Sequence, residues 1–240
     1  MRVLVIVCAA IFYMSMLPAA EAGKLTGKVV VSSKLQNEIS ERKKSESKNT
    51  YYWNLENGIL PIRSERISLQ RDIAVVLFDA DATETKPDKL KSVKVHAGAM
   101  ERNVIVTRPG STIRFRNVDP MDHELYCPDL PSFEPERQSN GSFRPIRFES
   151  EGIFEVRCKL IPHFKGYVVV TKGVHVIPLN GDGTFALNNV SAGKYTLKVF
   201  LDGEWIHKQS FTVPDDRRRE VKLQVKLASA KPSTKKAAKK

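Results

Sequence analysis

Apolar and polar residues alternate along most of the chain with a period of two. The segments 111–117, 153–158, 195–200 and 220–227 read STIRFRN, IFEVRC, YTLKVF and EVKLQVKL. Successive side chains of a β-strand point to opposite faces, so each segment places its apolar residues on one face of a sheet. Turn sequences such as RPGS, NGDG and SAGK separate the alternating segments. The pattern predicts an all-β protein of sandwich type with no long amphipathic helix.

The first 22 residues have the pattern of a secretory signal peptide. Arg2 precedes an apolar run over residues 3–17, and Ala-Glu-Ala at 20–22 is a small-residue cleavage pattern. We therefore predict a signal peptide over 1–22, cleavage after Ala22, and a mature chain that is periplasmic or secreted. No other run approaches the ~20 apolar residues of a membrane-spanning helix, so no transmembrane span is expected.

The mature length allows one or two domains, and the sequence pattern changes beyond Thr171. We expect a first domain over 23–172, a smaller β module over 173–227, and a basic disordered tail over 228–240. The polar segment 32–70 lies between two apolar strands. It is expected to form a mobile insertion in the first domain, although YYWNLENGILPI at 51–62 could instead form a small ordered patch.

The formal net charge of +12 is concentrated at the C-terminal end. Between Arg217 and Lys240 there are ten Lys and Arg residues against one acidic residue. Such a tail could bind an anionic surface or an acidic partner, or could serve only to keep the protein soluble. Nucleic acid is not expected as a partner, because the chain is predicted to be exported and shows no stripe of mixed basic and aromatic residues.

Two segments hold the candidate metal ligands. NVDPMDH at 117–123 ends in His123, and RCKLIPHFKG at 157–166 contains Cys158 and His163. The strand alternation before the second segment turns Cys158 inward, on the same face as the apolar residues that precede it. A buried thiol and two imidazoles in loops are candidates for a metal site.

These segments resemble the cupredoxin family of small copper proteins, which includes plastocyanin and azurin. In that family an Asn-x-Asp-x-x-x-His segment supplies the first histidine, and Asn117, Asp119 and His123 match it. A later loop supplies a cysteine and a second histidine. The resemblance covers about residues 25–171, and it looks closest to the bacterial periplasmic cupredoxin-like proteins of the methylamine-utilisation type.

The resemblance implies a Greek-key cupredoxin-like β-sandwich that holds one copper ion. Cys158 would supply the thiolate, and His123 and His163 the imidazoles, a ligand set that suits both Cu(I) and Cu(II). The loop departs from the family pattern, because Ile161 stands at the usual His position and Phe164 at the usual Met position. The site is therefore expected to lack an axial sulfur.

A copper protein of this kind would transfer electrons or carry copper, in contact with a periplasmic redox or envelope partner. It is not expected to be an enzyme, because five histidines without a His-Cys-His run are too few for a multicopper oxidase. The alternative is a metal-free module of the cell envelope that keeps the fold after losing the site. Ile161 and Phe164 favour this alternative.

A disulfide between Cys127 and Cys158 would consume the thiolate. Cys8 leaves with the signal peptide, and an exported protein permits disulfides. His123 and Cys127 are ~13 Å apart if the chain between them is extended, whereas a disulfide needs Cα atoms within ~7 Å. Cys158 can therefore hardly reach both, and a copper thiolate, a disulfide and two free cysteines all remain open.

The sequence after residue 172 has a pattern of its own. GTFALNNVSAGKYTLKV at 183–199 resembles the carboxypeptidase regulatory-like or transthyretin-like β module. Nothing in this module indicates catalysis, and Trp205 is expected to take part in packing, the alternative being a platform for a sugar. The remaining histidines, His96, His175 and His207, are expected on the surface.

Overall fold

The structure is a computed structural model that describes residues 23–47, 66–79, 86–215 and 220–228. Strands dominate these residues, and one helix accompanies them. The prediction of an all-β protein of sandwich type is confirmed. The predicted signal peptide, the middle of the predicted insertion and all but the first residue of the predicted tail lie outside the described residues. No helix in the described part of the chain is long and apolar enough to cross a membrane.

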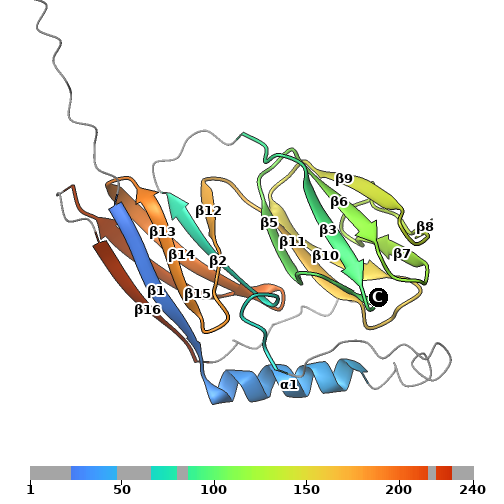
Figure 1. Ribbon diagram of the computed structural model, residues 1–240, viewed down its shortest axis with the longest axis horizontal. Helices are drawn as coiled ribbons and strands as arrows, with labels where there is room; N and C mark the ends of the chain where they lie inside the picture. Colours follow the sequence, from blue (N-terminus) through green and yellow to red (C-terminus); the bar gives the residue numbers. More distant parts are fainter. Residues whose placement is uncertain (1–22, 48–65, 80–85, 216–219, 229–240) are drawn as a thin grey trace, which may run out of the picture.

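Four sheets form two sandwiches (Figure 1). The strands of the first sandwich are β1 (Gly23–Val31), β2 (Ile73–Asp79), β12 (Val174–Ile177), β13 (Thr184–Val190), β14 (Gly193–Leu201), β15 (Glu204–Val213) and β16 (Glu220–Leu227). They form a three-stranded sheet of order β13-β1-β16 and a four-stranded sheet of order β12-β2-β14-β15.

The second sandwich contains the two candidate ligand segments. Its strands are β3 (Lys91–His96), β4 (Ala99–Met100), β5 (Val104–Thr107), β6 (Ser111–Asn117), β7 (His123–Tyr126), β8 (Glu136–Gln138), β9 (Phe143–Phe148), β10 (Gly152–Cys158) and β11 (Lys165–Val170). They form a five-stranded sheet of order β5-β11-β10-β7-β8 and a four-stranded sheet of order β4-β3-β6-β9.

Three apolar cores hold the sheets together. One core fills each sandwich. The third lies between the sandwiches, where Ala74 and Val76 of β2 meet Tyr167 and Val169 of β11, with Phe200 of β14 beside them. Ile73, Val75 and Leu77 point into the first core, so this part of β2 is buried on both faces. Burial on both faces explains why β2 is a continuous apolar run and does not alternate.

Strands β1 and β2 do not join the domain that we predicted for them. β1 pairs with β13 and β16, and β2 pairs with β12 and β14. The second sandwich is thus inserted between β2 and β12 of the first. The predicted division, 23–172 and 173–227, is wrong for these two strands, because an apolar pattern predicts that a segment is a strand but not which strand it pairs with.

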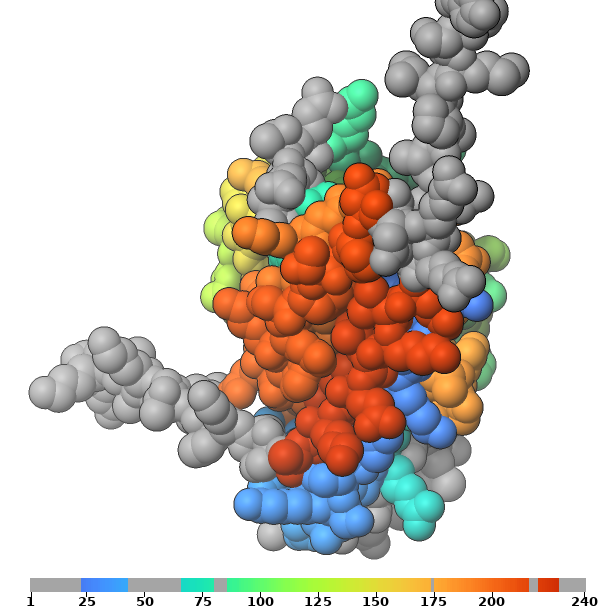
Figure 2. All heavy atoms as spheres, turned by 90° about the vertical axis from the view of Figure 1, so that its left-hand side faces the viewer, coloured from blue at the N-terminus to red at the C-terminus, as the bar shows by residue number. Residues whose placement is uncertain are grey.

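The segment predicted as a mobile insertion begins with a helix, α1 (Ser33–Ser47). Ser32 caps it, since its hydroxyl accepts a hydrogen bond from the backbone amide of Leu35 at 3.1 Å. Leu35 and Ile39 lie one turn apart and are buried in the first core. Figure 2 shows α1, in blue, at one end of the face formed by β1, β15 and β16. Residues 33–47 therefore form a helix, which the sequence analysis did not predict for this segment.

We expect Leu35→Ala to lower the free energy of unfolding by about 2–5 kcal/mol. Leu35 is fully buried, and truncating a buried leucine loses its transfer free energy and leaves a cavity. The neighbouring Lys34 is exposed, so Lys34→Ala should change the stability by less than ~0.5 kcal/mol. Urea denaturation followed by circular dichroism measures both variants. Two equally small changes would show that α1 does not stabilise the first core.

Candidate metal centre

Strands β7 and β10 bring two of the three predicted ligands together. The strands are antiparallel, with Cys158 opposite Leu125. His123 precedes Leu125 by two residues, which makes it a diagonal neighbour of Cys158. Its Nδ1 lies 3.7 Å from the Cys158 Sγ, and the two side chains are 0% and 4% exposed. A thiol and an imidazole nitrogen thus face each other inside the second sandwich.

Cys127 lies on the other side of Leu125 and is not bonded to Cys158. Both cysteines are free and buried. Cys127 follows Leu125 by two residues, and diagonal neighbours on paired strands are about 7–8 Å apart, which exceeds the ~7 Å that a disulfide spans. The disulfide alternative is therefore wrong for this structure, and the thiol of Cys158 is available.

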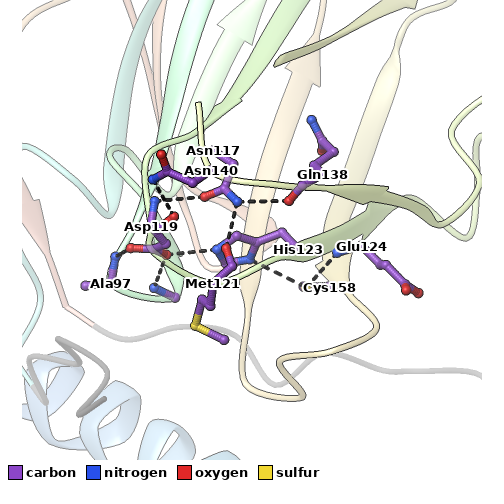
Figure 3. Close-up of polar contacts among 10 residues, drawn as sticks. Ala97, Asn117, Asp119, Met121, His123, Glu124, Gln138, Asn140 and Cys158 are labelled. Atoms are coloured by element: carbon purple, nitrogen blue, oxygen red, sulfur yellow. Dashed lines mark hydrogen bonds and ion pairs between the residues drawn. The ribbon is translucent and has the colours of Figure 1, made fainter. Parts of the chain in front are cut away.

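Asp119 orients the ring of His123 (Figure 3). Its Oδ2 lies 2.8 Å from His123 Nε2 and accepts a hydrogen bond from the amide of Gly98 at 2.9 Å. Its Oδ1 accepts a hydrogen bond from the amide of Ala97. An ionised carboxylate only accepts hydrogen bonds, so Nε2 carries the ring proton. The lone pair on Nδ1 is therefore directed toward Cys158, in the tautomer that can bind a metal.

The two amides come from a tight turn between β3 and β4. Ala97 and Gly98 have φ angles of 51° and 69°, and two successive positive values are typical of a two-residue hairpin turn. A Cβ at Gly98 would lie 3.6 Å from the Nε2 of His163, which places that ring against the turn. This turn was not predicted, because Ala-Gly is not one of the residue pairs that typically indicate a two-residue hairpin.

Asn117 holds the loop that carries Asp119. Its Nδ2 donates to the carbonyl oxygens of Met121 at 2.8 Å and Gln138 at 2.9 Å, and its Oδ1 accepts from the amide of Asp119 at 2.8 Å. Asn140 donates to the carbonyl of Asp119 at 2.7 Å. Gln138 and Asn140 were not predicted, because they follow β7 by more than ten residues and reach the loop only through the pairing of β7 with β8.

Burial sets the protonation of the facing pair. It lowers the pKa of His123 below its ordinary value, although the hydrogen bond with Asp119 and its charge act in the opposite direction. Burial also raises the pKa of the Cys158 thiol, against the effect of backbone amides around the sulfur. One of these amides, from Glu124, donates to Sγ at 3.4 Å. At neutral pH the pair is therefore a neutral imidazole and a thiol, and the thiol can donate its proton to Nδ1.

His163 lies on the loop between β10 and β11 and is 5% exposed, so it is not an exposed turn residue. Ile161 and Phe164 of the same loop are also buried. The ring centroid of Phe164 lies 6.1 Å from that of His123. Within the described residues, no three His, Cys, Asp or Glu side chains form a group that could hold a metal ion. The structure therefore brings the side chains of His123 and Cys158 together. It does not bring His163 close enough for the three predicted ligands to form a metal-binding group.

The other residues singled out in the sequence lie away from this pair. His96 and His175 are exposed, as expected, whereas His207 is half-buried on β15. The ring of Trp205 packs against Phe200 and Phe78, with centroids 5.3 Å and 5.7 Å apart. The predicted packing role of Trp205 is confirmed.

Comparison with known proteins returned copper proteins among the solved structures. No family model and no curated protein matches the chain. A purple cupredoxin from Nitrosopumilus maritimus is 20% identical, with a TM-score of 0.31, over 34% of this chain and 99% of its own. Amicyanin from Paracoccus versutus is 19% identical, with a TM-score of 0.32, over 42% and 100%. A copper-containing nitrite reductase from Thermus scotoductus is 21% identical, with a TM-score of 0.32, over 39% and 24%. At these values the comparison assigns neither a family nor a function.

Proposed function

We propose that this chain is an exported copper-binding protein that transfers electrons or carries copper, and that it is not an enzyme. One observation carries the proposal: the buried Nδ1 of His123 faces the buried Sγ of Cys158 at 3.7 Å. Asp119 holds the ring in the tautomer that leaves Nδ1 free to bind. The proposed location is the periplasm or the exterior, where a redox or envelope partner would meet the protein.

The facing pair fits a copper ion by its chemistry and its spacing. Thiolate and imidazole are the ligands of copper sites that transfer electrons with little rearrangement of the ligands. Zinc bonds to the same two atom types are about 2.0 Å and 2.3 Å long, so two atoms that would hold one ion must lie less than about 4.3 Å apart. The separation in the structure is 3.7 Å. Bound copper would supply one-electron chemistry, and His163 is the proposed third ligand.

A second candidate is a metal-free module of the cell envelope. Ile161 and Phe164 are 0% and 3% exposed and fill the loop with apolar side chains. The thiol of Cys158 would then serve only as a hydrogen-bond partner of His123. Under this candidate the second sandwich is a scaffold, and the pair is a satisfied part of its core.

A titration of the purified chain with Cu(II) separates the two candidates. We expect one copper per chain to survive desalting, with intense visible absorption from thiolate to copper or with rapid reduction to bound Cu(I). The first candidate fails if desalting removes all the copper and no absorption develops. His163→Ala should weaken retention if His163 completes the ligand set, and leave it unchanged if it does not.

We expect the apparent affinity for Cu(I) to rise about tenfold per pH unit between pH 6.5 and 9, because binding must release the Cys158 proton. Burial raises the pKa of this thiol above its ordinary 9.0, so the proton is present throughout the window. Burial lowers the pKa of His123 below 6.5, so the imidazole adds no second proton. Competition with a Cu(I) chelator at several pH values measures the slope. A flat profile would show that Cys158 does not bind the ion.

A further inference from the structure

The outer face of the sheet β4-β3-β6-β9 carries a group of cations. Residues of β3, β6 and β9 alternate between the second core and the outside. The outward positions hold Lys94 on β3, Arg114 and Arg116 on β6, and Phe143 and Arg147 on β9. We call these five residues the cationic face. None of the outward positions on these described strands is acidic. The contact with the first sandwich is made by β5 and β11 of the other sheet.

The strand register places like charges side by side. Lys94 lies directly opposite Arg116 on the neighbouring strand, and like charges in this position destabilise a sheet. In the part of the chain that the structure describes, neither residue takes part in an ion pair. Arg147 does pair with Glu149 at 2.7 Å, but both are exposed, and such a pair contributes little. The repulsion between Lys94 and Arg116 would be relieved by a bound anion.

An exposed aromatic ring lies beside these charges. Phe143 is 55% exposed and is paired with Arg116 across β6 and β9. The guanidinium of Arg114 covers one side of its ring, at 4.5 Å from the centroid. The cationic face therefore presents charge and one flat apolar surface together.

The four cations form a diagonal stripe across three strands. From Lys94 to Arg116 the distance between strands is about 5 Å, and from Arg116 to Arg114 along β6 it is about 7 Å. Arg147 is a diagonal neighbour of Arg114, at about 7–8 Å. A stripe with this spacing matches anionic groups that repeat along an extended polymer. Pro145 lies in β9, at the open edge of the sheet, and disfavours the addition of a peptide strand there.

We propose that the cationic face binds an acidic polysaccharide, a polymer whose carboxylate or sulfate groups repeat along an extended chain. The stripe would pair with the anionic groups, and the Phe143 ring would pack against the apolar face of a sugar. Single-stranded nucleic acid has the same two features. The export predicted from the sequence favours the polysaccharide. This site is separate from Cys158 and His123 and does not depend on copper.

The test uses the full mature chain and a fluorescently labelled oligogalacturonate at low salt. The double variant K94Q/R116Q should raise the Kd about tenfold, because it removes two of the four cations that would pair with the anionic groups. The double variant K24Q/K28Q removes the same charge from exposed positions of β1 and should change the Kd less than about twofold. Phe143→Ala should raise it about fivefold.

Equal weakening by K94Q/R116Q and K24Q/K28Q would overturn the proposal, because net charge alone would then explain binding. Tighter binding of a single-stranded oligodeoxythymidylate or of poly-glutamate with the same number of charges would also overturn it, in favour of another polymer. The melting temperature checks the folding of each variant. K94Q/R116Q should melt no lower than the parent, since it removes a like-charge pair.

Discussion

Cys158→Ser should reduce the Cu(I) affinity of the protein by at least ~100-fold. The substitution replaces the soft thiolate by a hydroxyl of similar shape. The hydroxyl can still accept a hydrogen bond from the Glu124 amide, which donates to the sulfur at 3.4 Å in the parent. It can also donate to Nδ1 of His123. The fold should therefore persist while the proposed thiolate ligand is lost. Competition with a Cu(I) chelator measures the change.

Cys127→Ser is the matched control for this experiment. Cys127 is a free cysteine buried in the same core, with 3% exposure against 4% for Cys158. Both substitutions place a hydroxyl in a buried position, so their structural costs are comparable. Only Cys158 faces His123. If both variants lost copper equally, the loss would follow from a weakened core, and the metal-free candidate would replace the copper proposal.

The strands were predictable from the sequence because alternation is a local property. The segments 111–117 and 153–158 are confirmed almost to the residue as β6 and β10. Their pairing was not predictable, because it depends on contacts between distant segments. β1 and β2 show this most clearly, since their partners lie more than ninety residues away. Helix α1 was missed because its apolar side is only Leu35 and Ile39 in a segment rich in charge.

The candidate site was predictable where the chain supplies ligands in short motifs. The Asn-x-Asp-x-x-x-His segment and the inward parity of Cys158 together predicted the contact between His123 and Cys158. The hairpin of Ala97 and Gly98 was not predictable as a part of the site, because it reaches Asp119 through space. The cationic face was not predictable either, because it too depends on contacts between distant segments. No stripe of basic and aromatic residues exists along the chain, and only the pairing of β3, β6 and β9 assembles one.

Asp119→Asn should lower both the stability and the copper affinity of the protein. The carboxylate of Asp119 is 3% exposed and accepts hydrogen bonds from three donors, the amides of Ala97 and Gly98 and the Nε2 of His123. An asparagine has an amino group in place of one carboxylate oxygen, and an amino group is a hydrogen-bond donor. This amino group would therefore face at least one of the three donors that the carboxylate accepts from. Leaving a buried donor without an acceptor costs about 1–3 kcal/mol, and the free energy of unfolding should fall by that amount.

The amino group of the introduced asparagine has a second option that would move the ring proton of His123. It can donate to Nε2, and the ring must then carry its proton on Nδ1, which faces Cys158. A protonated Nδ1 cannot bind a metal, so the copper affinity should fall about 10–100-fold, the range measured when partners of metal-bound histidines are removed. The nitrogen chemical shifts of His123 report this tautomer directly. Asp122→Asn is the matched control, because the carboxylate of Asp122 bonds to Arg137 and acts on His123 only through its charge. Equal effects of the two substitutions, or an unchanged tautomer in D119N with copper binding intact, would show that Asp119 does not orient the ligand.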